Sequence, residues 1–74
     1  MILLKLEVRF DNVFKEWVIY TFKINDVTGD KVLYNIEHFP SEDRAVRIAK
    51  FYQVNRGCQL DIFDKFGISS QRII

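Results

Sequence analysis

Residues 17–24 read WVIYTFKI, and this run constrains the fold more than any other part of the chain. Nearly every position is β-branched or aromatic, which predicts a β-strand. Because side chains alternate along a strand, one face would carry Val18, Tyr20, Phe22 and Ile24, and the other Trp17, Ile19 and Thr21. A strand that is apolar on both faces is usually a central strand, so the chain must build further strands beside it.

Two further runs supply those strands. Residues 2–10 alternate between apolar side chains and the charged residues Lys5, Glu7 and Arg9, which predicts a strand with one face in water. The loop NDVTGD at residues 25–30 predicts a hairpin, so residues 31–39 should form a third strand.

The period of the pattern changes after Pro40. Ser41 is suited to cap a helix, and Ala45, Ile48, Ala49 and Tyr52 recur at helical spacing. These residues predict an amphipathic helix of roughly fourteen residues that ends at Gly57. Its two alanines indicate close approach to a sheet.

Residues 58–63 alternate again, residues 64–67 should turn the chain, and a last short strand is expected from Ile68 onward. The expected fold is therefore α+β: an antiparallel sheet of four to five strands with one helix packed on one face, in the order β-β-β-α-β-β. With 74 residues there is room for one core, so residues 1–74 should form a single domain.

The stretch CQLDIFDKFGI, residues 58–68, raises the question of catalysis. Asp61 and Asp64 could serve as a carboxylate pair in acid–base chemistry or hold a hard cation. The alternative is structural: Asp61 alternates with apolar neighbours in a strand, and Asp64 and Gly67 form a turn. We favour the turn.

Neither a catalytic pair nor a metal site stands out elsewhere. His38 and Cys58 are the only histidine and the only cysteine, and Cys58 alternates with apolar residues, as a core residue does. Zinc sites usually draw on several such ligands, and the scattered glycines form no phosphate loop. We expect no catalytic residue, no metal and no cofactor.

Eight positions resemble small bacterial YegP-like domains of unknown function. These domains have a Trp early in a strand, spaced alanines in a helix, a Gly at its end, a leucine-any-isoleucine strand and a turn closing on Gly-Ile. The matching residues here are Trp17, Ala45, Ala49, Gly57, Leu60, Ile62, Gly67 and Ile68. The likeness covers about the last thirty residues well and the first forty poorly, and it implies no activity.

The expected helix is too narrow to cover the apolar side chains of the expected sheet, and this indicates a binding surface. A helix is about 10 Å wide, whereas four or five strands make a sheet nearer 20 Å across, so one helix leaves apolar surface exposed. Such surface usually marks a binding site. We therefore expect a non-enzymatic protein-binding module that associates with itself or with a larger target. The residues expected to contact the partner are Arg44, Arg47, Lys50, Phe51 and Trp17.

The alternative is a small nucleic-acid-binding protein that uses the same basic and aromatic helix face, with Arg56 added. The formal net charge of +1 gives no general attraction to nucleic acid or membranes. Charges interrupt the apolar N-terminus, so we expect no signal peptide and no membrane span, and the one free cysteine favours the cytoplasm. By association with other small proteins of similar composition, a phage or mobile-element accessory or inhibitor protein is expected.

Overall fold

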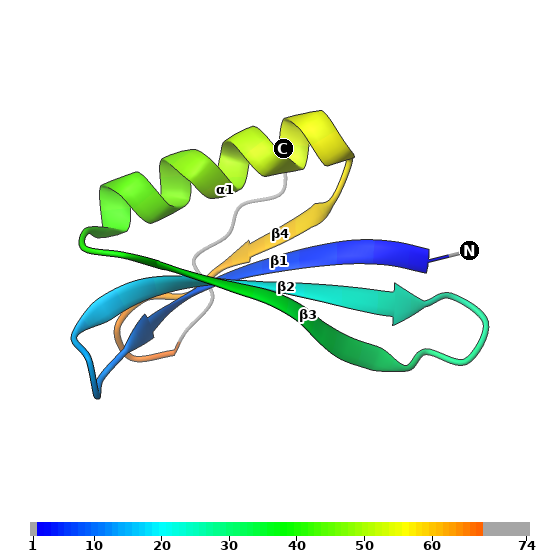
Figure 1. Ribbon diagram of the computed structural model, residues 1–74, viewed down its shortest axis with the longest axis horizontal. Helices are drawn as coiled ribbons and strands as arrows, with labels where there is room; N and C mark the ends of the chain where they lie inside the picture. Colours follow the sequence, from blue (N-terminus) through cyan, green and yellow to red (C-terminus); the bar gives the residue numbers. More distant parts are fainter. Residues whose placement is uncertain (1, 68–74) are drawn as a thin grey trace.

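The computed structural model describes residues 2–67, which form three strands, a helix and a fourth strand. The elements are β1 (Ile2–Asp11), β2 (Glu16–Asn25), β3 (Lys31–Phe39), α1 (Glu42–Arg56) and β4 (Gln59–Ile62). This order confirms the predicted α+β class, with α1 lying along one face of the sheet (Figure 1). The strand expected from Ile68 onward lies outside the described residues.

The sheet has the strand order β3-β2-β1-β4, so β1 and β2 are both central. β1 pairs antiparallel with β2, and β2 antiparallel with β3, but β4 pairs parallel with β1. The expectation of a wholly antiparallel sheet is therefore wrong at this edge. β3 and β4 run in the same direction on opposite edges, and α1 is the crossover that such a parallel connection requires.

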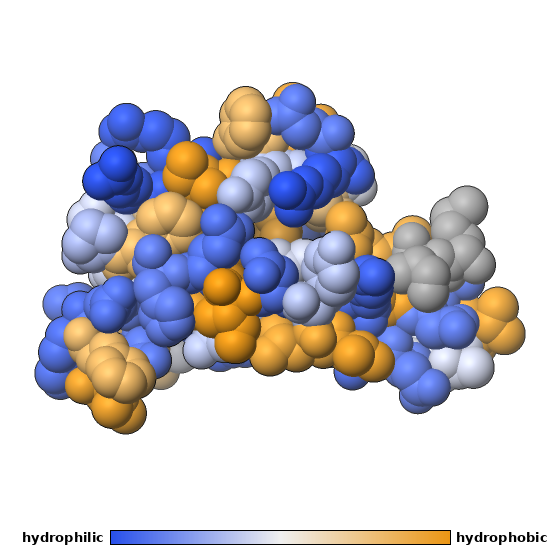
Figure 2. Space-filling view, viewed as in Figure 1, coloured by the Kyte–Doolittle hydropathy of each residue, from blue (hydrophilic) through white to orange (hydrophobic). Residues whose placement is uncertain are grey.

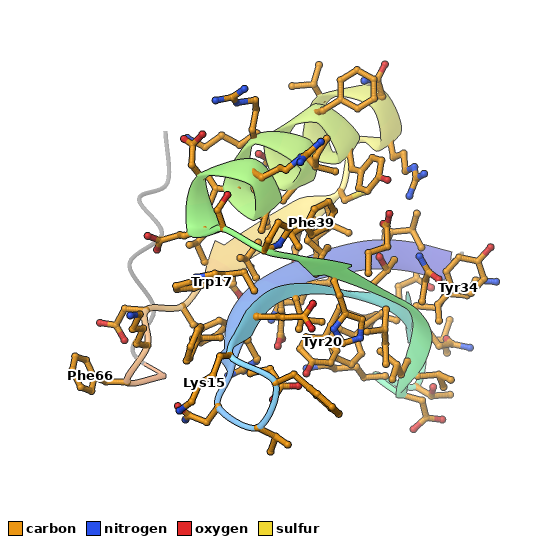
Figure 3. All side chains as sticks on the ribbon, turned by 60° about the vertical axis from the view of Figure 1, so that its left-hand side comes forward. Lys15, Trp17, Tyr20, Tyr34, Phe39 and Phe66 are labelled. Carbon is orange, nitrogen blue, oxygen red and sulfur yellow. The ribbon has the colours of Figure 1, made fainter. Side chains whose placement is uncertain are left out.

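The core lies between α1 and the sheet. It consists of buried residues from every layer: Leu6 and Val8 of β1, Trp17 and Ile19 of β2, Ala45 and Ala49 of α1, and Cys58 and Leu60 next to and in β4. The two alanines are fully buried, which lets the helix backbone approach the strands closely. Trp17 and Phe39 point toward α1, whereas Tyr20 lies on the other side of the sheet (Figure 3).

Both ends of α1 follow the sequence signals. The Ser41 side chain accepts a hydrogen bond from the Arg44 amide at 3.2 Å, as an N-cap residue does. Gly57 ends the helix in the left-handed conformation, with φ 63°, and its amide donates to the Gln53 carbonyl at 2.9 Å.

A β-bulge in β3 changes which side chains share a face. Thr21 pairs with Asn35 but the next residue, Phe22, pairs with Leu33, so Tyr34 is the additional residue. Before the bulge, Leu33 therefore lies on the same face as Phe22, not on the Phe39 face as strict alternation predicts. Tyr34 instead lies under the Lys23 ammonium, 4.1 Å from the ring centroid.

Candidate functional site

The sequence-predicted acidic residues do not form a pair. Asp61 extends from β4 and makes an ion pair with Lys5 of β1, with 2.9 Å between Nζ and Oδ2. Asp64 is in the following turn, where its Oδ1 accepts from the Phe66 amide at 2.9 Å and its carbonyl accepts from the Gly67 amide at 3.0 Å. The turn interpretation is confirmed, and each carboxylate has a structural role. No cluster of three or more His, Cys, Asp or Glu residues that could hold a metal ion occurs within residues 2–67.

Cys58 and His38 lie on opposite sides of the sheet. Cys58 is in the core beneath α1, where its thiol donates to the Tyr52 carbonyl at 3.9 Å. Burial raises the pKa of this thiol, although Arg56 opposes the change. His38 pairs with Val18 on the other face, and its Nδ1 lies 3.9 Å from a Glu16 carboxylate oxygen. The two side chains therefore cannot act together as a nucleophile and a base.

The residues expected to bind a partner divide into two groups. Arg44, Arg47, Lys50 and Phe51 are exposed on α1, and we call these four the helix patch. Phe51 is 61% exposed, whereas Arg47 is already paired with Asp43 at 2.6 Å. Trp17 is only 6% exposed and packs in the core with its ring centroid 5.2 Å from that of Phe10. The prediction that Trp17 contacts a partner is therefore wrong, because its side chain is buried in the core.

A second surface, absent from that expected set, is the sheet face opposite α1. α1 does not lie over this face, and we call it the open face, although Val18 within it is fully buried. Its apolar part, here named the apolar stripe, comes from the facing residues of β2 and β3: Tyr20, Phe22, Leu33 and Ile36. Leu33 is 46% exposed and Ile36 is 43% exposed. In Figure 2 hydrophobic residues line the arched underside of the molecule, between a lobe at each end.

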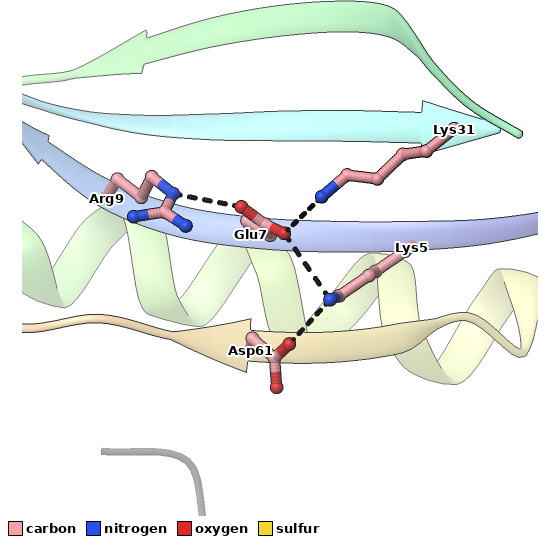
Figure 4. Close-up of polar contacts among 5 residues, drawn as sticks. All are labelled: Lys5, Glu7, Arg9, Lys31 and Asp61. Atoms are coloured by element: carbon pink, nitrogen blue, oxygen red, sulfur yellow. Dashed lines mark hydrogen bonds and ion pairs between the residues drawn. The ribbon is translucent and has the colours of Figure 1, made fainter. Parts of the chain in front are cut away.

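Beside the apolar stripe, β1 places a carboxylate among three cations. Glu7 is only 3% exposed, although alternation predicts that this face of β1 is in water. One Glu7 oxygen accepts from Arg9 Nε at 2.9 Å. The other accepts from Lys31 Nζ at 3.1 Å and lies 3.4 Å from Lys5 Nζ. Figure 4 shows how Asp61 extends the cluster through Lys5. We call Lys5, Glu7, Arg9, Lys31 and Asp61 the ion cluster.

The ion cluster fixes the ionisation of Glu7. Burial alone would raise the pKa of the carboxyl, but the hydrogen bonds and positive charges of Arg9 and Lys31 outweigh burial, so the pKa is lowered. The pKa of Lys5 is raised, mainly by its hydrogen bond to Asp61. Glu7 is therefore held as a carboxylate, poorly suited to accept a proton and well suited to orient the surrounding cations.

Two of these cations also lie over aromatic rings. Lys31 Nζ is 4.2 Å from the centroid of the Phe22 ring, and the Arg9 guanidinium carbon is 3.8 Å from that of Phe63. Cations in these positions are attracted by the ring faces. Lys31 thus crosses the apolar stripe to reach Glu7, so the charged and apolar parts of the open face form one continuous surface.

Glu7 does not stand out in the sequence, because the alternation of residues 2–10 predicts a strand with one face in water. Two signals pointed elsewhere: Lys5, Glu7 and Arg9 stand at alternate positions and so share a face, and their signs also alternate. The missing information was that strands pair with β1 on both sides, which shields the middle residue from water.

Comparison of the chain with models of protein families, with curated proteins and with solved structures found no match. The resemblance to YegP-like domains therefore stays a prediction. In the part of the chain that the structure describes, no helix combines the length and the apolar character needed to cross a membrane.

Proposed function

We propose that this protein is a small, non-catalytic protein-binding module and that the open face is its main contact surface. The observation that supports the proposal is the apolar stripe, whose residues Leu33 and Ile36 remain almost half exposed in the folded chain. Exposed apolar surface of this kind, bordered by charged residues, is typical of interaction sites. Each 100 Å² of it that a partner covers contributes about 2.5 kcal/mol before the entropic cost of association.

The chemistry of the open face favours binding over catalysis. Glu7 is surrounded by cations, and Asp61 is paired with Lys5. A general acid or base needs a pKa close to the working pH, and the lowered pKa of Glu7 moves away from that range. The same ion pairs give a partner fixed positions for charged contacts.

The proposal can be tested with two variants that separate the two exposed surfaces. Ile36→Asp places a charge in the apolar stripe, and Phe51→Ala removes the exposed ring of the helix patch. Each protein would be immobilised and the captured proteins compared by quantitative mass spectrometry. We expect Ile36→Asp to lose a partner that wild type and Phe51→Ala both retain. If Ile36→Asp captures the same proteins as wild type in the same amounts, the open face is not the contact surface.

A second candidate function is nucleic-acid binding through the helix patch. The observation that favours it is the exposed Phe51 ring on the same helix face as the exposed cation Arg44, with the exposed Lys50 next to it in the chain. Aromatic rings stack on bases and cations contact phosphates, so affinity should fall steeply as salt is raised. A gel-shift titration with single-stranded DNA that shows no retardation at low salt would eliminate this candidate.

A further inference from the structure

From the open face we infer the chemical class of the partner: an amphipathic helix of another protein that carries acidic residues beside its apolar side. This inference rests on the proposed function, because it names what the open face binds.

The shape of the open face suits a convex partner. The loop between β1 and β2 and the loop between β2 and β3 lie at opposite ends of the sheet, and the underside between the two ends is arched (Figures 1 and 2). The apolar stripe occupies two adjacent strands, about 5 Å apart, and side chains extend its width to roughly the 10 Å diameter of a helix. α1 already covers the opposite face of the same sheet. A partner helix on the open face would complete a three-layer arrangement.

The charges beside the apolar stripe favour acidic groups. The ion cluster has three cations, Lys5, Arg9 and Lys31, and two carboxylates, Glu7 and Asp61, which leaves one positive charge. The Glu7 carboxylate is buried under the cations, whereas the side chains of Arg9 and Lys31 are 42% and 43% exposed. A partner that approaches this part of the open face therefore meets the exposed cations Arg9 and Lys31, and within the ion cluster the accessible carboxylate is that of Asp61, 36% exposed and paired with Lys5. Glutamate or aspartate residues flanking an apolar helix side would pair with these cations.

The same charges disfavour a second copy of this chain on the open face. When two sheets pack face to face with their strands nearly aligned, a two-fold axis lies either across the strands or along them. With the axis across the strands, each ion cluster would meet the other, and both carry a net positive charge. With the axis along the strands, each apolar stripe would meet charged groups. Neither arrangement covers the apolar stripe while pairing the charges.

Addition of a strand at the edge of the sheet is also disfavoured. β3 is an edge strand and carries Leu33 and Ile36 of the apolar stripe, but its bulge at Tyr34 breaks the regular spacing of backbone groups that an added strand needs. A helix makes no demand on those groups, since its own backbone hydrogen bonds are internal.

The inference is tested with a displayed library of eighteen-residue amphipathic helices, a length of roughly 27 Å. One helix side is randomised among Leu, Ile, Val, Phe and Met, and all other positions among Glu, Lys, Gln and Ser. The library is selected against the full-length wild-type protein, with Ile36→Asp as the counter-target. Pools from wild type are sequenced, and the best peptides are synthesised with a matched version in which every Glu is Lys.

We expect the enriched peptides to be rich in Glu and poor in Lys, to bind Ile36→Asp at least tenfold more weakly, and to lose at least tenfold in affinity when Glu is replaced by Lys. Arg9→Gln, which removes the positive charge without placing a second carboxylate beside Glu7, should weaken binding of the acidic peptide and strengthen binding of its Lys version. Enrichment of neutral or basic helices that need Ile36 would overturn the acidic partner and leave the proposed function standing.

Other outcomes would contradict the helical partner or the use of the open face itself. Peptides that bind Ile36→Asp as well as wild type would contradict both the inference and the use of the open face, whereas no enrichment over that variant would contradict the helical partner. A stable dimer in solution whose open face is protected would assign that face to a second copy. Tight binding of a twelve-residue oligothymidine that Ile36→Asp abolishes would assign it to nucleic acid. Either result would contradict the helix.

Discussion

Glu7 shows how one residue can connect folding with the binding surface. It lies in the centre of β1, between β2 and β4, and its carboxylate receives hydrogen bonds from β1 and from β3. A buried charge is costly unless it is paired, and here three cations pair it. The ion cluster therefore holds the edge strand β3 to the centre of the sheet and fixes the cations of the open face.

Replacing this carboxylate with an amide should destabilise the protein measurably. Glu7→Gln keeps the size of the side chain but removes the charge that Arg9 and Lys31 bind. We expect the free energy of unfolding to fall by about 1.5–3 kcal/mol, the range for hydrogen bonds to charged groups. Urea denaturation followed by circular dichroism measures the change. Asp43→Asn, which breaks the exposed pair with Arg47, serves as the control and should leave the midpoint unchanged.

The same pair of proteins should differ in their response to acid. Because the pKa of Glu7 is lowered in the folded state, its contribution is complete above the ordinary value of 4.5 and is lost as the pH falls below it. The stability of wild type should therefore approach that of Glu7→Gln as the pH is lowered from about 4.5 through the lowered pKa of Glu7 in the folded state. A difference between the two that stays constant over this range would show that Glu7 does not act through its charge.

Thr21 presents the opposite case, a buried polar atom that the fold does not satisfy. Its side chain is 1% exposed, and Oγ1 has no hydrogen-bond partner in the part of the chain that is described. A buried hydroxyl without a partner costs about 1–3 kcal/mol, so Thr21→Val, which has nearly the same shape, should raise the free energy of unfolding. Thermal denaturation would reveal the gain as a higher Tm. A lower Tm would mean that Oγ1 is bonded in solution.

At the scale of elements, the helix and the turns could be predicted from the sequence, because each depends on residues close together in the chain. The cap at Ser41, the helical spacing of the alanines and the stop at Gly57 predicted α1 nearly to the residue. The turn residues at 25–30 and 64–67 were likewise predicted from their own side-chain and backbone preferences.

The pairing of the strands could not be predicted in this way. The parallel placement of β4 beside β1 depends on where α1 returns the chain, and the bulge at Tyr34 depends on how β3 fits β2. Neither the parallel pairing nor the bulge can be recognised from the alternation of apolar and polar residues in β3 and β4. This limited what the sequence could predict about the candidate site. Exposed apolar surface on the sheet was predicted, but which face carries it, the role of Glu7 and the burial of Trp17 depend on the pairing register of the strands.

The helix cap offers a prediction at the same scale. Ser41→Ala removes the hydrogen bond from the Arg44 amide and should cost about 1 kcal/mol, whereas Ser41→Asp should retain the cap. The comparison is made by urea denaturation of both variants and wild type. Because Ala45 and Ala49 of α1 belong to the core, fraying of the first turn of the helix should lower the free energy of unfolding as well as the helix content. Equal loss in both variants would contradict the role of the cap.

The whole molecule has two unlike sides, a sheet face buried under α1 and an open face. A substitution should therefore be tolerated at an exposed position of the open face and not in the core beneath α1. Ile36→Asp, on the open face, should change the free energy of unfolding by less than about 1 kcal/mol, as is usual for surface positions. Ile19→Ala, in the core beneath α1, should cost about 2–5 kcal/mol. Chemical denaturation of both variants provides the comparison, and a severe loss in Ile36→Asp would show that the fold itself needs the apolar stripe.

The most direct measurement of the central claim is the solvent accessibility of methyl groups in the free monomer, by nuclear magnetic resonance with a soluble gadolinium chelate. We predict strong relaxation of the Leu33 and Ile36 methyl signals and weak relaxation of those of Leu6 and Ile19, in accord with their exposure. An acidic helical peptide from the selection should then protect Leu33 and Ile36. If the methyl groups of Leu33 and Ile36 are as protected as those of Leu6 in the isolated monomer, the chain covers its own open face and needs no partner there.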